Sequence, residues 1–411
     1  MENRFYLGID LDDGNAVLSC YELNMREPET FSMVAGSQLY QIPVLLAKKN
    51  GMEQWLIGEE AGRLAMEQGG GSVEALLTRA LRQETVFVDG ENYPAEELLC
   101  LFLKKLLILA GGIGSSRPAD KLVVCVEQLS RGLVELFAGL APRLGFSETQ
   151  ITLLDRKECF YYFACCQPRE LVLHDVYLFD CRDGRVQCCL LTHRKGTSPQ
   201  LVTITEETRS ISGSGQDEAF LRILGDCFQG RIVSSAYLTG DGFDGGWMKR
   251  SVSLLCQGRR AFMGKNLYSK GACYAAAVLD GQREWQYVYL GDNEMKVNVS
   301  LKVLQRGVTE FYTLISAGAN WYETVGECEV LLDGTPEISF WLQAPEDKSA
   351  RMERLELADL PERPAGTTRL RITAKPLSDE RVQIRIRDLG FGEFFRSSGK
   401  VWEYVMSLEG E

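Results

Sequence analysis

The chain has 411 residues, enough for two or three domains, and its 45% hydrophobic and 25% charged residues are typical of an ordinary globular protein. Its formal net charge of −12 argues against a general binder of nucleic acid or acidic membranes, because both need a basic protein surface. Thirteen cysteines without a CxxC pair, and only two histidines, argue against a structural zinc site and favour buried free thiols in a reducing cytoplasm.

The first predicted element is a β-hairpin. Apolar residues alternate from Phe5 to Ile9, Asp12-Asp13-Gly14-Asn15 has turn chemistry, and an apolar run resumes at Ala16. Asp10 ends the buried strand, where a carboxylate can orient the waters of a metal while the N–H groups of the turn face a phosphate. An ordinary surface hairpin is the alternative interpretation, because Asp-Gly turns are common. With a strand this close to Met1, no signal peptide is expected.

The rest of the first half alternates short strands with helices. A second hairpin bends at Asn50-Gly51 and leads into a helix from about Gly58. A leucine-rich helix begins at Pro94 and ends near Ala110; it is too short to span a bilayer. The remaining predicted elements are a short helix over 73–82, strands over 121–126 and 150–154, and helices over 130–144 and 156–167, the last capped by Asp155.

The second half repeats this plan. Residues 175–191 again read as strand, acidic glycine turn and strand, with Asp180 in the position that Asp10 has in the first hairpin. Two halves that open with the same hairpin predict a duplicated α/β domain with a ligand cleft between them. The following predicted elements are a strand over 200–205, a Gly213-Ser214-Gly215 turn, a helix over 216–228, a strand over 231–238 ending in Thr239-Gly240-Asp241-Gly242, a helix from about Asp244, a strand over 260–262 and a helix over 269–279.

From about Gln286 the pattern changes to strict alternation. Val382, Ile384 and Ile386 would face one way and the residues between them the other, and similar runs recur between Pro and Gly turns. This predicts a small antiparallel β-sandwich over 296–411, joined to residues 1–290 by a linker at 291–294. Arg369, Arg371, Arg385 and Arg387 would form a basic stripe on one face, read either as a solvated face or as a partner-binding surface.

The order of these motifs resembles the actin, sugar kinase and heat-shock chaperone superfamily. Gly8-Ile9-Asp10-Leu11, Phe179-Asp180, residues 238–242 and residues 269–276 resemble its phosphate-1, phosphate-2, adenosine and connect motifs. Residues 42–44 with 56–61, and residues 355–366 in the β-sandwich, narrow the resemblance to the seventy-kilodalton heat-shock chaperones. The resemblance implies a ribonuclease-H-like ATPase-type domain with lobes of about 1–172 and 173–290, followed by a peptide-binding β-sandwich.

The same resemblance implies a set of site residues. Asp10 and Asp180 would hold Mg²⁺ and, in an active enzyme, be catalytic. The residues expected to bind ATP or ADP are Asp12, Asp13, Gly14, Gly184, Gly213, Gly215, Gly240, Asp241 and Gly242. Partners would be a protein or extended peptide bound by the β-sandwich, with no nucleic acid and no membrane.

Departures from the family pattern argue against efficient ATP hydrolysis. Asp12-Asp13-Gly14 replaces a neutral phosphate turn, and Cys181-Arg182-Asp183-Gly184 puts side chains where a glycine backbone would approach the ligand. The family's catalytic lysine has no counterpart except Arg79, and its glutamate falls near Arg156, with Glu158 two residues away. Most of subdomain IIB is missing between the Gly213 turn and residue 231, and no helical lid is expected after the β-sandwich.

Two functions follow as alternatives. The first is a chaperone-like binding or scaffold protein with a degenerate nucleotide cleft, and the second is a working Mg-ATP-dependent chaperone-like ATPase. A sugar or acid kinase fits less well, because it would leave the β-sandwich unexplained. The doublets Cys165-Cys166 and Cys188-Cys189 are interpreted as core or edge packing, with metal binding as the lesser alternative.

Overall fold

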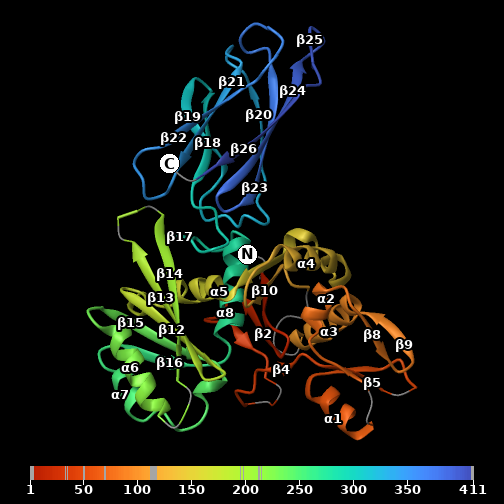
Figure 1. The fold of residues 1–411 in the computed structure, drawn as a ribbon, viewed down its shortest axis with the longest axis vertical. Helices are drawn as coiled ribbons and strands as arrows, with labels where there is room; N and C mark the ends of the chain where they lie inside the picture. The colour runs from red at the N-terminus through yellow and green to blue at the C-terminus, as the bar shows by residue number, and fades with distance from the viewer. Residues whose placement is uncertain are drawn as a thin grey trace. The chain divides into compact units, whose positions relative to one another are not determined.

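The computed structural model describes residues 4–32, 34, 36–49, 51–68, 71–111, 118–194, 196–197, 199–211, 213 and 215–408. The chain divides into two compact units, which Figure 1 draws as a ribbon. The first contains Met1–His193 and Ile204–Trp285, and the second contains Arg194–Thr203 and Gln286–Glu411. The prediction of a mixed α/β protein is confirmed, because helices and strands alternate in the first unit.

The first sheet of the first unit is built around the predicted opening hairpin. β1 (Phe5–Leu11) pairs antiparallel with β2 (Asn15–Glu22), and β10 (Lys121–Val126) adds to β1 in parallel. The strand order is β11-β10-β1-β2-β3, with β11 at Ile151–Asp155, β3 at Glu29–Thr30 and β4 (Ile42–Pro43) also paired with β2. Every residue of β1 is buried, as expected for a central strand with both faces covered.

The second sheet also places a hairpin beside two parallel strands. β12 (Asp175–Arg182) pairs with β13 (Arg185–Arg194), and β15 (Val233–Thr239) and β16 (Arg260–Met263) follow in parallel beyond β12. β14 (Gln200–Ser210) lies beyond β13. The hairpin turn has positive φ at both central residues, 49° at Asp183 and 70° at Gly184, the combination that a type I′ turn requires.

Two buried helices contact each other and the sheets. α5 (Arg156–Cys165) packs against α8 (Leu267–Leu279), and Figure 1 shows both between the two sheets. The contacts require glycine: a Cβ on Gly271 would lie 2.0 Å from the Cys159 carbonyl oxygen, and one on Gly8 would lie 2.2 Å from the Ser269 carbonyl oxygen. No side chain larger than hydrogen fits at either position without moving a backbone.

The remaining helices and small sheets of this unit agree with most predicted ranges. Two helices begin later than predicted. The first is α2, which begins at Leu76 because residues 72–73 pair with β5. The second is α7, which begins at Arg250, where the Asp217 carboxylate accepts hydrogen bonds from the backbone N–H groups of residues 249–251. The elements are α1 (Gly58–Gln68), α2 (Leu76–Leu81), α3 (Ala95–Ala110), α4 (Arg131–Leu144), α6 (Gln216–Phe228), α7 (Arg250–Leu255), β5 (Leu46–Lys48), β6 (Trp55–Ile57), β7 (Ser72–Val73), β8 (Thr85–Val88) and β9 (Glu91–Pro94).

The second unit contains two antiparallel sheets. One has the order β19-β18-β21-β22, and the other has β20-β23-β24-β25, with β26 also paired with β24. The strands are β17 (Tyr287–Tyr289), which pairs with residues 200–202, β18 (Asn298–Gln305), β19 (Val308–Ile315), β20 (Gly326–Leu331), β21 (Glu337–Gln343), β22 (Arg351–Glu356), β23 (Arg369–Ser378), β24 (Arg381–Phe391), β25 (Phe395–Arg396) and β26 (Val401–Ser407).

Alternate residues of these strands form one apolar core. Val382, Ile384 and Ile386 of β24 are fully buried, as their spacing predicts, and they join inward-facing residues of both sheets. The predicted linker at 291–294 is instead packed into this unit: Glu294 is 1% exposed and accepts a 2.7 Å hydrogen bond from the Gly291 N–H.

The predicted basic stripe lies on the exposed face of β23 and β24 beside acidic residues. Arg371 is 2.7 Å from Glu329, and Arg385 is 3.3 Å from Glu403. These pairs favour the interpretation as a solvated face. Among the described residues, no helix combines the length and the hydrophobicity that a membrane crossing requires.

Candidate functional site

The two strand-end aspartates of the first unit belong to one continuous series of ion pairs. Arg156, the first residue of α5, lies 3.4 Å from Asp10 and 2.9 Å from Asp12. Arg182, the last residue of β12, lies 3.2 Å from the same Asp12 oxygen and 3.0 Å from Asp180. The series Asp10–Arg156–Asp12–Arg182–Asp180, hereafter the cleft network, thus joins the ends of both hairpins.

Local structure fixes each member of the cleft network. Asp10 and Asp180 are buried because they lie near the ends of strands whose residues are buried on both faces. Asp12 is oriented by its own turn, since its Oδ1 accepts hydrogen bonds of 2.9 Å from Gly14 N–H and 2.8 Å from Asn15 N–H. The Tyr268 hydroxyl donates a 3.0 Å bond to the second Asp180 oxygen.

Burial and neighbouring charge shift the pKa values of Asp10 and Asp12, the two carboxyls that Arg156 contacts, in opposite directions. Burial raises the pKa of Asp10 above its usual value, although Arg156 and Arg182 act to lower it. For Asp12 burial also acts to raise the pKa, but hydrogen bonds from the turn and the charge of Arg156 outweigh it and lower the pKa. Arg156 lies 5.3 Å from the centre of the Tyr268 ring, a cation–π contact that adds to its fixation.

Little space remains beside the cleft network. The cavity there has a volume of about 20 Å³, close to that of one water, and its lining includes Gln41, Gly240 and Lys265. Two guanidinium groups occupy the carboxylate oxygens that a magnesium ion would need, and their positive charge repels a cation. The residues present therefore do not fit the Mg²⁺ ion that the family resemblance implies.

The predicted adenosine-side residues lie at the edge of the same cavity. Asp241 is bound by Lys265, 2.7 Å away, and by the Gln41 amide at 3.2 Å. Gly240 has a φ of 94°, and a Cβ there would lie 2.3 Å from the Cys181 carbonyl oxygen. A Cβ on Gly242 would lie 2.3 Å from the Cys181 sulfur. These glycines allow the chain to pass the second hairpin closely, which is a packing role.

Other predicted residues are engaged elsewhere. Asp13 accepts hydrogen bonds from the N–H and hydroxyl of Thr78 in α2, and Gly184 accepts a 2.8 Å bond from Ile211 N–H. Gly215 precedes α6, and Gly213 has a φ of 107°. Ser214, between them, lies outside the described residues.

Some residues of the cleft were anticipated from the sequence and others were missed. Arg156 and Arg182 were recognised as departures from the family pattern, but not as partners of the same aspartate. Lys265 and Tyr268 gave no signal, because a lysine just before a helix and a tyrosine in its first turn are common. Arg79, the only substitute for the family's lysine, instead lies 2.9 Å from Glu84.

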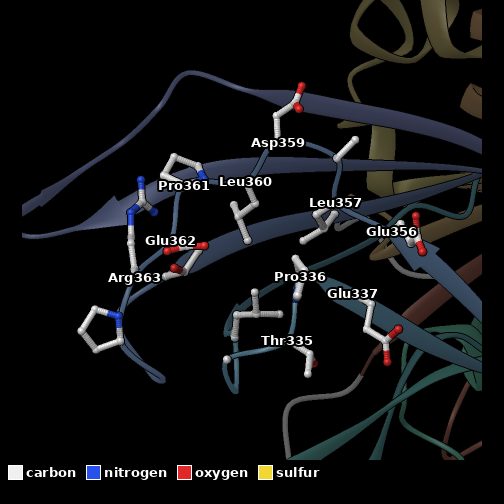
Figure 2. A pocket seen from close by; sticks show the side chains of 15 residues that line it. Thr335, Pro336, Glu337, Glu356, Leu357, Asp359, Leu360, Pro361, Glu362 and Arg363 are labelled. Carbon is white, nitrogen blue, oxygen red and sulfur yellow. The ribbon is translucent and has the colours of Figure 1, made fainter.

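A second candidate site is a groove in the second unit, with a volume of about 830 Å³. It runs between residues 332–337 on one side and 356–364 on the other (Figure 2). Figure 2 shows Leu357 and Leu360 pointing from one segment toward Pro336 on the other. Pro361 and Pro364 also line the groove. Prolines lack an N–H and fix φ, so they stiffen this wall.

The groove carries an excess of negative charge. Glu337 and Glu356 are directly opposite each other on β21 and β22, and Glu362 follows on the second wall, where Asp359 is paired with Lys400, 3.3 Å away. The guanidinium of Arg363 makes two 2.9 Å bonds to the buried Asp388, so its charge is already compensated. Like charges opposite each other on neighbouring strands are destabilising unless a cation lies between or near them.

Comparison with known families gives two matches. Residues 27–292 match the family described as "Family of unknown function (DUF5716) C-terminal", and residues 294–408 match "Domain of unknown function (DUF8552)". A search of curated proteins gave no match.

Proposed function

The chain belongs to the DUF5716 C-terminal family of unknown function, and we propose that it is a non-catalytic binding or scaffold protein. In this proposal the first unit is an actin-like, heat-shock-chaperone-like domain whose nucleotide cleft is closed by its own ion pairs. The second unit is the part that binds an extended peptide.

The cleft network is the observation that carries the first half of the proposal. Phosphoryl transfer depends on positioned metal ions and cationic groups around the polyphosphate. Here both strand-end carboxylates are bound by arginines, and Asp12 is bound by both of them. To admit a metal-bound triphosphate, two guanidinium groups would have to leave three carboxylates that are partly or fully buried, at a large electrostatic cost.

Chain topology and composition support the same proposal. Both sheets of the first unit place a hairpin beside two parallel strands, the arrangement expected of two related lobes. Among the described residues between β14 and β15 there is one helix, α6, where the resembling family has a whole subdomain. None of the thirteen cysteines forms a disulfide, consistent with the cytoplasmic location that we include in the proposal.

The acidic groove is the observation that favours peptide binding. Its leucine and proline lining suits apolar side chains of an extended chain, and its carboxylates suit lysine or arginine side chains between them. We therefore assign to the groove an extended peptide that alternates apolar and basic residues. Exposed charge pairs contribute about 0.2–1 kcal/mol each, so binding is expected to weaken as salt is added.

Isothermal titration with Mg-ATP and Mg-ADP tests the closed cleft. We expect no saturable heat in the millimolar range and no turnover. The variant Arg182→Ala, which opens the cavity from its exposed side, is expected to remain folded and to gain space without gaining turnover. Micromolar binding by the unaltered protein, with hydrolysis that is lost in Asp10→Ala, would overturn the proposal and support a working ATPase.

Fluorescence polarisation with labelled peptides tests the groove. A short peptide alternating leucine and lysine is expected to bind, whereas one alternating leucine and glutamate is not. Glu337→Gln and Glu362→Gln should each weaken binding by up to about fivefold, the limit for an exposed pair. Glu403→Gln, in the same unit but outside the groove, is the matched control. Equal binding of both peptides, or an equal effect of the control, would contradict the assignment.

A further inference from the structure

A cluster of two thiols and a carboxylate lies in the second sheet of the first unit, apart from the cleft network. It consists of Cys188 on β13, Glu207 on β14 and Cys227 near the end of α6. Their ligand atoms all lie within 4.8 Å of one another, and the Cys227 sulfur is 4.0 Å from Glu207 Oε1. From this geometry we infer a zinc-binding site with a Cys₂Glu ligand set.

Strand alternation explains why these three side chains meet. Successive residues of a strand point to opposite faces, so Cys188 and Cys189 separate, as do Glu206 and Glu207. Glu206 bonds Gln187 and lies 3.7 Å from Lys157 of α5, on one face. Its neighbour therefore faces the other way, toward α6. The cysteine doublet of the sequence thus supplies one sulfur to the cluster, and the third ligand comes from a helix.

The distances suit one tetrahedral ion after a small contraction. Zinc–sulfur bonds of about 2.3 Å and zinc–oxygen bonds of about 2.1 Å place ligand atoms about 3.6–3.8 Å apart. The 4.0 Å separation of Cys227 sulfur and Glu207 oxygen needs only a few tenths of an ångström. Both cysteines are buried, while the side chain of Glu207 is 47% exposed, so an ion and its fourth ligand, a water, have access from that side.

Charge and surroundings favour the same ion. Two thiolates and a carboxylate leave zinc with a net charge of −1, and Arg209 compensates for it because its Nη2 lies 3.1 and 2.9 Å from the two Glu207 oxygens. Both cysteines belong to one buried apolar cluster, which also contains Val186 and Ile211. The absence of CxxC pairs and the presence of only two histidines argue against zinc from the sequence, but ligands brought together from β13, β14 and α6 need neither CxxC spacing nor a histidine.

Cobalt(II) titration of the reduced full chain, followed by displacement with zinc, tests this site. We expect one cobalt per chain, a thiolate-to-cobalt absorption band, visible bands of a tetrahedral ion, and loss of all of them when zinc is added. Cys227→Ser should abolish the bands. Glu207→Gln, a change at a half-exposed position that the fold tolerates, should weaken zinc binding about 100-fold or more, beyond the effect of losing an outer-shell partner.

The exposed Cys256 provides the control, because Cys256→Ser removes a thiol far from the cluster in the sequence and outside its ligand set. It should leave the cobalt spectrum and the zinc affinity unchanged. Absence of a thiolate band would overturn the inference. Bands that persist in both Cys227→Ser and Glu207→Gln, or that vanish in Cys256→Ser, would also overturn it.

Discussion

Replacing Arg156 with methionine tests the electrostatic description of the cleft network. Arg156 and Asp10 have side chains only 9% and 10% exposed, so Arg156→Met leaves a buried carboxylate without its principal cation. Breaking a buried pair by removing one partner costs about 3–5 kcal/mol. The loss should appear in the urea dependence of amide exchange in β1 (Phe5–Leu11), which reports on the first unit alone.

The pH dependence of this loss has a definite sign. Burial already raises the pKa of the Asp10 carboxyl above its value in the unfolded chain, so the folded state binds the carboxyl proton more tightly. The free energy of unfolding therefore falls as pH rises from the unfolded pKa of Asp10 through its folded pKa. Without Arg156 the pKa rises further. The destabilisation should therefore be largest at neutral pH and shrink as pH falls toward about 4, the unfolded value.

A double-mutant cycle separates charge from packing. Asp10→Asn in the Arg156→Met background removes the uncompensated charge and should restore most of the lost stability. The reasoning would be refuted by a single variant less than about 1 kcal/mol below the unaltered protein, the scale of an exposed pair. A double variant as unstable as the single one would refute it as well.

Three further predictions concern packing, a second buried pair and thiol exposure. Gly271→Ala should destabilise the first unit by about 1–3 kcal/mol or more in urea unfolding, because its Cβ meets the Cys159 carbonyl, whereas Gly139→Ala, which meets nothing within 4 Å, should be neutral or stabilising by up to about 1 kcal/mol. Arg363→Met should cost the second unit about 3–5 kcal/mol at neutral pH, because Asp388 is fully buried. Hydrogen bonds from Arg363 and Ser398 hold the pKa of Asp388 well below the usual range. In the unaltered protein the stability that the Arg363–Asp388 pair contributes is therefore lost as pH falls below about 4, which urea titrations at several pH values would measure. Reaction with a thiol reagent should modify Cys256 rapidly in the native state and all thirteen cysteines after unfolding; rapid native modification of a buried cysteine would contradict the fold.

Local signals account for the parts of the fold that the sequence predicts well. The cap of α5 was identified from Asp155 alone, and its side chain accepts a 2.7 Å hydrogen bond from Glu158 N–H. The alternation of β24 and the type I′ chemistry of the Asp183-Gly184 turn are equally local. In each case the residues that decide the structure lie within a few positions of one another.

The site was less predictable, because its contacts join distant parts of the chain. Arg156 and Arg182 are separated from Asp12 by 144 and 170 residues. The sequence shows that charged residues replace neutral ones near the cleft, but not which carboxylate each guanidinium will reach. The acidic groove has the same difficulty, since its two walls combine a turn before β21 with the connection between β22 and β23.

The two arginines of the cleft network differ in exposure, and this difference decides how the cleft could open. Arg156 is 9% exposed and is held by Asp10, Asp12 and the Tyr268 ring, so its departure would strand buried charge. Arg182 is 41% exposed, and its contact with Asp12 is shared with Arg156, so it is the more easily displaced of the two, although its departure leaves the buried Asp180 with the Tyr268 hydroxyl and no cation. Any opening should therefore proceed through Arg182 and leave Asp180 without a cation while Asp10 and Asp12 stay bound by Arg156. A cleft in that state presents one free carboxylate, which is too few ligands for a magnesium triphosphate and repels an anion that arrives without metal. If the proposed closure is right, we expect nucleotide to stay out even when the more exposed arginine, Arg182, is displaced.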